Sequence, residues 1–321
     1  MSDKPKIGFY WCASCGGCEE SVVDLAEDIL TVADAVDIVF WPVALDFKKT
    51  DVLAMPDESI AAMFINGAVR TTEQEEMLHL LRKKSRVVVA YGSCAHLGGI
   101  PSLANQFDRN QILEYAYQEA PTVVNTEKTR PSLEYRSNGH CVTLPGFHQR
   151  VRTLSQVIDI DYYIPGCAPT PKLLKNAVVA LLEGKLPPRG SVLAPDVALC
   201  EECPRKNSKP TDIAYDSFNR VHWTEMDPDK CFLAQGVVCM GPATRGGCES
   251  LCISGNMPCT GCFGGTSRNI DQGAKMISSI CSAISAREDA GIDETLEGIP
   301  DPAGTFYRYG MAGSLLRGKN V

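Results

Sequence analysis

The sequence predicts an α/β protein, with a flavodoxin-like doubly wound parallel sheet followed by a second, irregular domain. Two observations predict this. Up to about residue 186, short and nearly all-apolar segments alternate with segments of helical periodicity, which is the pattern of parallel strands covered by helices. From residue 200 to residue 262, eight cysteines occur among many glycines and prolines with little periodicity, which is typical of a fold organised around metal.

The elements of the first domain follow from the spacing of its apolar residues. Apolar residues recur at helical spacing between residues 19 and 30, whereas Val87 to Ala90 form an unbroken apolar run. We expect strands at residues 5–11, 36–43, 60–66, 86–91 and 160–164, and helices at residues 19–30, 72–84 and 172–183. Proline and glycine at residues 187–190 indicate a linker. We therefore place one domain at residues 1–186 and another at residues 187–321, and assign no role to the tail after Cys281.

Charge and apolarity narrow the classes of partner. The formal net charge is -8 over 321 residues, so no basic field favours nucleic acid or an anionic membrane surface. No stretch approaches the roughly 18 consecutive apolar residues of a spanning helix. The first residues carry neither an apolar export signal nor a twin arginine. We expect a cytoplasmic protein with no membrane span and no nucleic-acid partner.

The fifteen cysteines are the most informative feature of the composition. A cytoplasmic chain keeps its thiols reduced, so cysteines in this number indicate bound metal rather than disulfides. Cys15 and Cys18 follow the first predicted strand, and Cys94 and Cys167 follow two later ones. Because the loops after parallel strands meet at one edge of the sheet, four thiolates can come together there.

Iron-sulfur chemistry suits these loops. A Cys-x-x-Cys turn presents two thiolates on one side, and both intervening residues of Cys15-Gly-Gly-Cys18 are glycine, so the backbone can approach inorganic sulfide closely. Structural zinc is the alternative, but zinc sites favour two Cys-x-x-Cys pairs, and this set has only one. Cys12 extends the pair to a ferredoxin-like run and is a competing ligand; we expect it to be a spare buried thiol.

Five motifs resemble those of the small subunits of nickel-iron hydrogenases, and their order covers most of the chain. They are Cys15-Gly-Gly-Cys-Glu-Glu-Ser21, Gly92-Ser-Cys-Ala95, Asp161-Tyr-Tyr-Ile-Pro-Gly-Cys-Ala-Pro169, Cys231-Phe-Leu-Ala-Gln-Gly-Val-Val-Cys-Met-Gly-Pro242 and Pro258-Cys-Thr-Gly-Cys262. The resemblance implies that the second domain is an iron-sulfur cluster domain.

The resemblance also implies three [4Fe-4S] clusters with twelve cysteine ligands. The proximal cluster, nearest the nickel-iron centre of the large subunit, takes Cys15, Cys18, Cys94 and Cys167; the medial cluster takes Cys248, Cys252, Cys259 and Cys262; the distal cluster takes Cys200, Cys203, Cys231 and Cys239. Cys200 stands where many family members have histidine. Cys252 stands where many exported members have proline and a three-iron cluster, so here we expect four irons and a lower reduction potential.

By this resemblance, the chain is the electron-transferring small subunit of a cytoplasmic nickel-iron hydrogenase and performs no bond chemistry itself. It looks most like the methyl-viologen-reducing type of methanogen hydrogenase, whose electrons pass to a [2Fe-2S] protein and heterodisulfide reductase. Two alternatives stay open: a small subunit of a deazaflavin- or NAD(P)-linked hydrogenase, and a zinc-stabilised, non-catalytic interaction protein. The related subunit of complex I is disfavoured, because it uses adjacent cysteines in its first loop and lacks the eight-cysteine region.

Other residues near the motifs have simpler explanations. We expect Cys141 and Cys281 to be core residues. Glu19 and Glu20 begin a helix, where the helix dipole stabilises carboxylates, and Glu20 is equally a candidate for holding the proximal loop or a subunit interface. His96 lies in a cluster loop and is a candidate hydrogen-bond partner of a sulfur, whereas no histidine is expected as a ligand.

Overall fold

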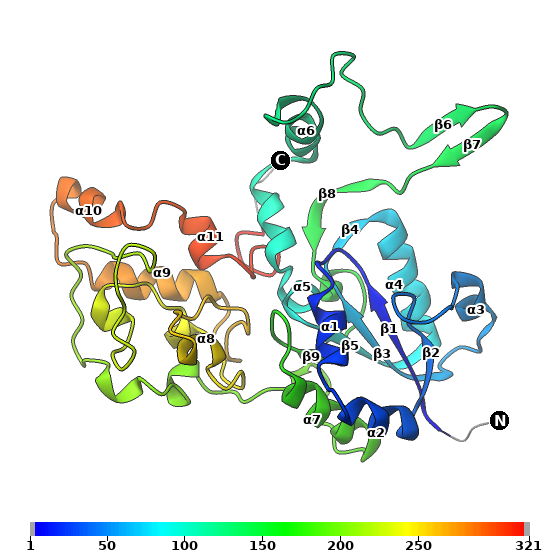
Figure 1. Ribbon diagram of the computed structural model, residues 1–321, viewed down its shortest axis with the longest axis horizontal. Coiled ribbons are helices and arrows are strands. Elements are labelled where there is room, and N and C mark those ends of the chain that lie inside the picture. Colours follow the sequence, from blue (N-terminus) through cyan, green and yellow to red (C-terminus); the bar gives the residue numbers. More distant parts are fainter. Residues whose placement is uncertain (1–3, 318–321) are drawn as a thin grey trace.

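The computed structural model describes residues 4–317. A sheet domain lies beside a second region of short helices and long loops, coloured yellow to red in Figure 1. None of the helices within residues 4–317 has the length and apolarity that a bilayer crossing needs.

Six parallel strands form the main sheet. They are β1 (Lys6–Trp11), β2 (Asp37–Phe40), β3 (Ile60–Asn66), β5 (Ser85–Tyr91), β9 (Tyr162–Ile164) and β10 (Ser191–Val192). They lie in the order β10-β9-β5-β3-β1-β2, and every neighbouring pair is parallel. Without β10 this is the flavodoxin-like order 2-1-3-4-5, so the predicted fold class is confirmed. The sheet continues past residue 186 through β10, and the division into two domains stays a prediction.

Helices cover both faces of the sheet. They are α1 (Gly17–Val23), α2 (Asp28–Ala35), α3 (Lys49–Ala54), α4 (Thr72–Lys84), α5 (Ser93–Leu97) and α7 (Pro171–Leu182). Val22 of α1 and Leu174 of α7 pack in one buried cluster, whereas Leu78 and Leu81 of α4 pack in another. The long helix expected at residues 19–30 is wrong, because the backbone of Ala26 is left-handed, with φ of 51°, and separates α1 from α2.

The second region has few regular elements: α8 (Leu251–Ser254), α9 (Gln272–Ser282), α10 (Asp289–Leu296) and α11 (Pro302–Phe306). Its apolar core includes Phe232, Met276 and Ile280, and the thiols of Cys239 and Cys259 lie in the same core. Apolar packing and cysteine side chains therefore share one interior.

The C-terminal tail, which had no predicted role, joins the two regions. The Gly99 N–H donates to the Tyr309 carbonyl at 2.8 Å, and the Gly313 N–H donates to the Leu97 carbonyl at 3.1 Å. On the other side, the Leu315 N–H donates to the Asp271 carboxylate at the start of α9, at 3.0 Å. The tail thus fixes the loop after β5 against the second region.

A long insertion between β5 and β9 leaves the body of the domain as an arm, seen at the top of Figure 1. It begins after η1 (Ile100–Gln106) and returns through β8, and the sequence pattern did not predict its elements. They are α6 (Arg109–Glu114), η2 (Tyr115–Glu119), β6 (Glu134–Ser137), β7 (His140–Thr143) and β8 (Phe147–Arg152), of which β8 pairs with β4 (Val69–Thr71).

Candidate functional site

Four cysteine thiols lie together at the carboxyl edge of the sheet. They come from the loop after β1, the start of α1, the start of α5 and the loop after β9. Burial raises the pKa of the Cys18 thiol above its usual value, and the charges of the other three cysteines raise it further. The structure therefore brings together the proximal quartet, which is Cys15, Cys18, Cys94 and Cys167.

Glycines let the backbone pass close to these sulfurs. Gly92 has φ of 88°, and a Cβ atom added there would stand 2.3 Å from the Cys18 Sγ. Gly99 has φ of 60°, and its Cβ would stand 2.3 Å from the Cys94 Sγ. A side chain at either position would displace a thiol, so these two glycines define the shape of the quartet.

A buried carboxylate anchors the first loop. Glu19 is 6% exposed and accepts hydrogen bonds from the Trp41 Nε1 and, at 2.6 Å, from the Asn66 Nδ2. Burial raises the pKa of Glu19, and these two hydrogen bonds offset part of the rise. Helix-start stabilisation is therefore an incomplete account of Glu19. Its partners are distant in sequence, so no local pattern could reveal this role, whereas Glu20 is exposed.

A second group, the distal quartet, lies in the second region. It consists of Cys200, Cys203, Cys231 and Cys239. Burial raises the pKa of the Cys200 thiol to about 11, with smaller contributions from Lys209, which lowers it, and from neighbouring cysteines, which raise it. Burial raises the pKa of the Cys239 thiol to about 12, and hydrogen bonds from the Gly241 and Cys259 N–H groups to the sulfur offset part of this rise.

The third group, the medial quartet, surrounds a cavity. A cavity of about 140 Å³ is lined by all four of its cysteines and also by Cys167 of the proximal quartet. Burial raises the pKa of the Cys262 thiol to about 12, and the N–H of Cys167 lowers it by donating to the sulfur. The members of the quartet are Cys248, Cys252, Cys259 and Cys262.

Contacts between the quartets place them in a line. Cys262 of the medial quartet interacts with Cys167 of the proximal quartet, and the Ser93 Oγ donates to the Cys262 carbonyl. At the other end, the charge of Cys239 raises the pKa of the Cys259 thiol, which burial has already raised. The medial quartet therefore lies between the proximal and distal quartets.

The chemistry of the thiols fits a polynuclear iron-sulfur group. Thiols with raised pKa values stay protonated at neutral pH unless a positive centre stabilises the thiolate. Iron-sulfur clusters are bound by cysteine thiolates and supply such a centre.

A buried arginine at the base of the arm also went unnoticed in the sequence. Arg70 is 6% exposed, and its Nη1 and Nη2 atoms are buried without a hydrogen-bond partner. Its guanidinium lies 4.0 Å from the centre of the Phe147 ring, and burial lowers its pKa to about 10.

The three remaining cysteines lie apart from the quartets. Cys12 is 5% exposed and packs against the apolar side chains of α4 and its neighbouring strands. Its burial is as expected, and its role as a spare thiol stays a prediction. The expectation that Cys141 and Cys281 are core residues is wrong, because both are exposed. Cys141 lies on a strand of the arm, and Cys281 lies on the outer side of α9.

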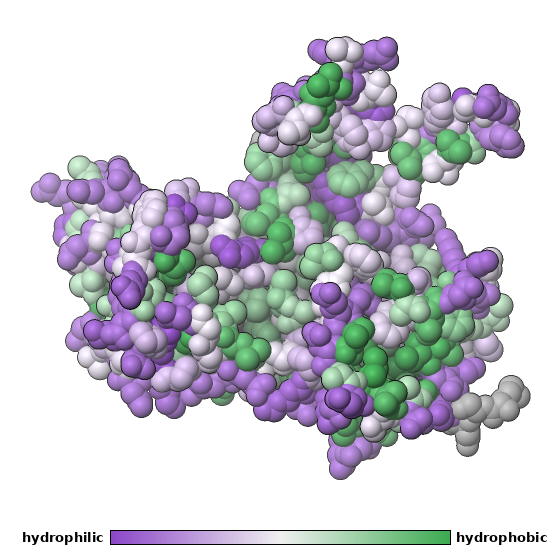
Figure 2. Space-filling view, viewed as in Figure 1, coloured by the Kyte–Doolittle hydropathy of each residue, from purple (hydrophilic) through white to green (hydrophobic). Residues whose placement is uncertain are grey.

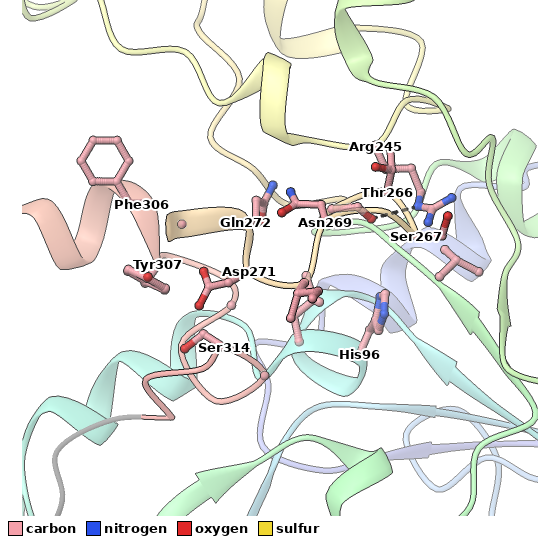
Figure 3. Close-up of a pocket in the computed structure, with 17 residues that line it drawn as sticks. His96, Arg245, Thr266, Ser267, Asn269, Asp271, Gln272, Phe306, Tyr307 and Ser314 are labelled. Carbon is pink, nitrogen blue, oxygen red and sulfur yellow. Dashed lines mark hydrogen bonds between the residues drawn. The ribbon is translucent and has the colours of Figure 1, made fainter. Parts of the chain in front are cut away.

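His96 lines a cavity between the two regions. This cavity, of about 280 Å³, is also lined by Arg245, Asp271 and Tyr307 (Figure 3). The His96 ring packs against Tyr163 with 4.6 Å between centres, and its Nδ1 has no hydrogen-bond partner. Burial and the charge of Arg245 lower the pKa of His96 to about 4. The His96 imidazole, at the contact between the two regions, is therefore neutral at pH 7.

Comparison with known proteins gives relatives along the whole chain. The family model of the NADH ubiquinone oxidoreductase 20 Kd subunit matches residues 15–181 and stops before the second region. The iron-sulfur subunit of the F420-non-reducing hydrogenase of Archaeoglobus profundus is 34% identical, with 98% of each chain covered. The corresponding subunit of the F420-non-reducing hydrogenase of Methanothermobacter thermautotrophicus is 37% identical, with 98% of this chain and 97% of the relative covered. The NiFeSe hydrogenase of Desulfovibrio vulgaris Hildenborough shares the fold, with a TM-score of 0.53 at 17% identity over 82% of this chain and 94% of that chain.

The relatives that match the whole chain define its class as a subunit of hydrogenases, which are oxidoreductase complexes. Within that class, the chain belongs to the family of iron-sulfur subunits of F420-non-reducing hydrogenases. The predicted resemblance is therefore confirmed, including the methanogen type to which the sequence pointed.

Proposed function

We propose that this chain is the electron-transferring small subunit of a nickel-iron hydrogenase complex and holds three [4Fe-4S] clusters through its twelve quartet cysteines. Electrons from the oxidation of dihydrogen in a large subunit enter at the proximal quartet and leave at the distal quartet. The downstream partner is a [2Fe-2S] protein and heterodisulfide reductase.

One observation carries this proposal: the medial quartet touches both of the others. The pair Cys167 and Cys262 joins the proximal and medial groups, and the pair Cys239 and Cys259 joins the medial and distal groups. Such a line is what a relay needs, whereas separate structural metal sites have no reason to share contacts. Bound clusters supply one-electron couples at each position.

The chain's own residues hold and tune these positions. N–H groups of Gly241, Ser250 and Gly261 donate to the sulfurs of quartet cysteines, and such hydrogen bonds raise the reduction potential of the neighbouring cluster. The apolar core around Cys239 and Cys259 keeps water from those sulfurs. A rigid, dry surrounding limits the reorganisation that accompanies each electron transfer.

The exposed thiols of the proximal quartet support a large-subunit binding site at this edge. Cys15 and Cys167 are exposed, whereas Cys18 and Cys94 are buried. A cluster held by exposed thiols needs a covering partner to exclude solvent. The relatives in these comparisons are hydrogenase subunits, so the covering partner is the subunit that holds the nickel-iron centre.

Iron analysis of the purified native complex tests the clusters. With one iron per thiolate, this polypeptide should account for about twelve irons, with broad visible absorption and three separable reduced signals in electron paramagnetic resonance. A colourless chain that contains zinc would refute the proposal and support the interaction protein instead.

The downstream partner is tested separately, by isolating the native complex and identifying the bound proteins. Recovery of a flavin-bearing disulfide reductase supports the proposed acceptor. A deazaflavin-binding or NAD-binding subunit in its place would refute that acceptor while leaving the relay intact.

A further inference from the structure

The tip of the arm is a hairpin that projects away from the body of the domain. Strands β6 and β7 form a separate two-stranded sheet, and all residues from 131 to 145 are exposed. A lone two-stranded hairpin is marginally stable in water, and both of its outer edges have unpaired backbone groups. Within residues 4–317, the hairpin therefore lacks the packing that would stabilise it.

One face of the hairpin is apolar. Tyr135 pairs with Val142 across the strands, and the Leu144 N–H donates to the Leu133 carbonyl at 3.0 Å. Because alternate residues of a strand share a face, these four side chains lie on the same side. They are 62% (Leu133), 65% (Tyr135), 58% (Val142) and 55% (Leu144) exposed. Figure 2 shows the apolar residues on the arm in green, among hydrophilic neighbours.

The turn of the hairpin aligns the four apolar side chains before any partner binds. Asn138 and Gly139 have φ values of 52° and 80°, as the two central residues of a type I′ turn require. An Asn-Gly turn fixes the strand register without help from other segments, and so aligns the apolar side chains. Preorganised apolar surface loses little conformational entropy on binding, which suits a docking element.

The two ends of the arm both lie next to the proximal quartet. The outgoing end follows Cys94 through α5 and η1. On the returning end, Val151 of β8 packs in one buried cluster with Cys94 and Ala68, and Ala68 pairs with Ala13 in the loop that carries Cys15. The arm is thus continuous with the edge of the sheet where the proximal thiols are exposed. In Figure 1 the second region lies to the left of the sheet domain, whereas the β6–β7 hairpin projects at the upper right.

From these observations we infer that the apolar face of the β6–β7 hairpin, formed by Leu133, Tyr135, Val142 and Leu144, docks onto the hydrogenase large subunit beside the proximal quartet. This inference rests on the proposed function, which places the large subunit over that edge. The downstream acceptor is disfavoured as the occupant, because it takes electrons at the distal end. The polar opposite face, with Glu134, Arg136 and Thr143, stays in solvent.

Titration of the large subunit against the cluster-loaded chain tests the docking. The double variant Tyr135→Ser, Val142→Ser should weaken binding at least about tenfold, because a tyrosine that becomes buried in an interface carries a large share of its binding energy, and the neighbouring valine adds buried apolar area. The matched control is Arg136→Ser, Thr143→Ser on the opposite face, which should change the affinity less than about twofold. Both pairs lie in a hairpin whose side chains are exposed, so neither variant disturbs the core, and iron content verifies that each variant is loaded.

Hydrogen exchange supplies a second measurement that does not depend on a variant. Amides of residues 134–143 should exchange much more slowly in the complex than in the free chain. Equal effects of the two variants, unchanged affinity, or unchanged exchange would overturn the docking, as would loss of the downstream acceptor alone or self-association through this face. If the wild-type chain contains no iron or binds no large subunit, the proposed function itself fails.

Discussion

Replacing Gly92 with alanine should remove the proximal cluster and leave the other two in place. The backbone at Gly92, with φ of 88° and ψ of 166°, is accessible almost only to glycine, and a side chain there costs about 1–3 kcal/mol. The added Cβ would stand 2.3 Å from the Cys18 Sγ, and such overpacking costs about 1–3 kcal/mol more. The summed cost of about 2–6 kcal/mol is comparable with a typical free energy of unfolding, about 5–15 kcal/mol.

Gly190 offers a matched control. Its φ is 86°, but no atom lies within 4 Å of the position of an added Cβ. The Gly190→Ala variant therefore carries the backbone strain alone and should keep about twelve irons, whereas Gly92→Ala should fall to about eight. Iron per polypeptide, reduced-state electron paramagnetic resonance and denaturant unfolding measure both effects. Wild-type iron content in Gly92→Ala, with a stability loss equal to that of Gly190→Ala, would refute the close-approach argument.

Further predictions concern single side chains. Cys252→Pro should convert the medial centre to a three-iron cluster, visible as a new resonance signal in the oxidised protein; an unchanged iron count contradicts the ligand assignment. Cys12→Ser should keep all clusters but lower the free energy of unfolding by about 1–3 kcal/mol, because it buries an unpaired hydroxyl; loss of the proximal signal would make this thiol a ligand. The Arg152 guanidinium, 2.7 Å from the Glu75 carboxylate, holds the pKa of Glu75 below its usual value. Glu75→Gln should therefore cost up to about 1 kcal/mol at pH 7. The difference should begin to shrink as pH falls below about 4.3, the unfolded pKa, and should be lost once pH falls below the lowered folded pKa; a difference that does not shrink on acidification is inconsistent with this ion pair.

The strand pattern predicted the sheet well, because parallel strands buried on both faces must be continuously apolar. β3 lies at residues 60–66, as expected from its apolar run, and the helix expected at residues 72–84 has those bounds in α4. The helix at residues 19–30 was wrong, since its apolar spacing continues across Ala26 while the backbone reverses there. The periodicity of apolar residues shows which side of a helix is buried. A residue with left-handed backbone changes the direction of the chain without altering the spacing of those apolar residues.

The sequence alone determined the chemistry of this protein: cysteines in glycine-containing loops after buried strands, in numbers and an order that point to iron-sulfur relays. Those features are local, because a buried strand is recognised from its own run of apolar residues and a turn from its own glycines. Only the tertiary structure decided which cysteines of neighbouring quartets interact, that Glu19 is anchored by Trp41 and Asn66, and that the arm leaves an apolar face uncovered. Each of these depends on contacts between residues far apart in the chain, and the free energy of such contacts has no signature in any single segment.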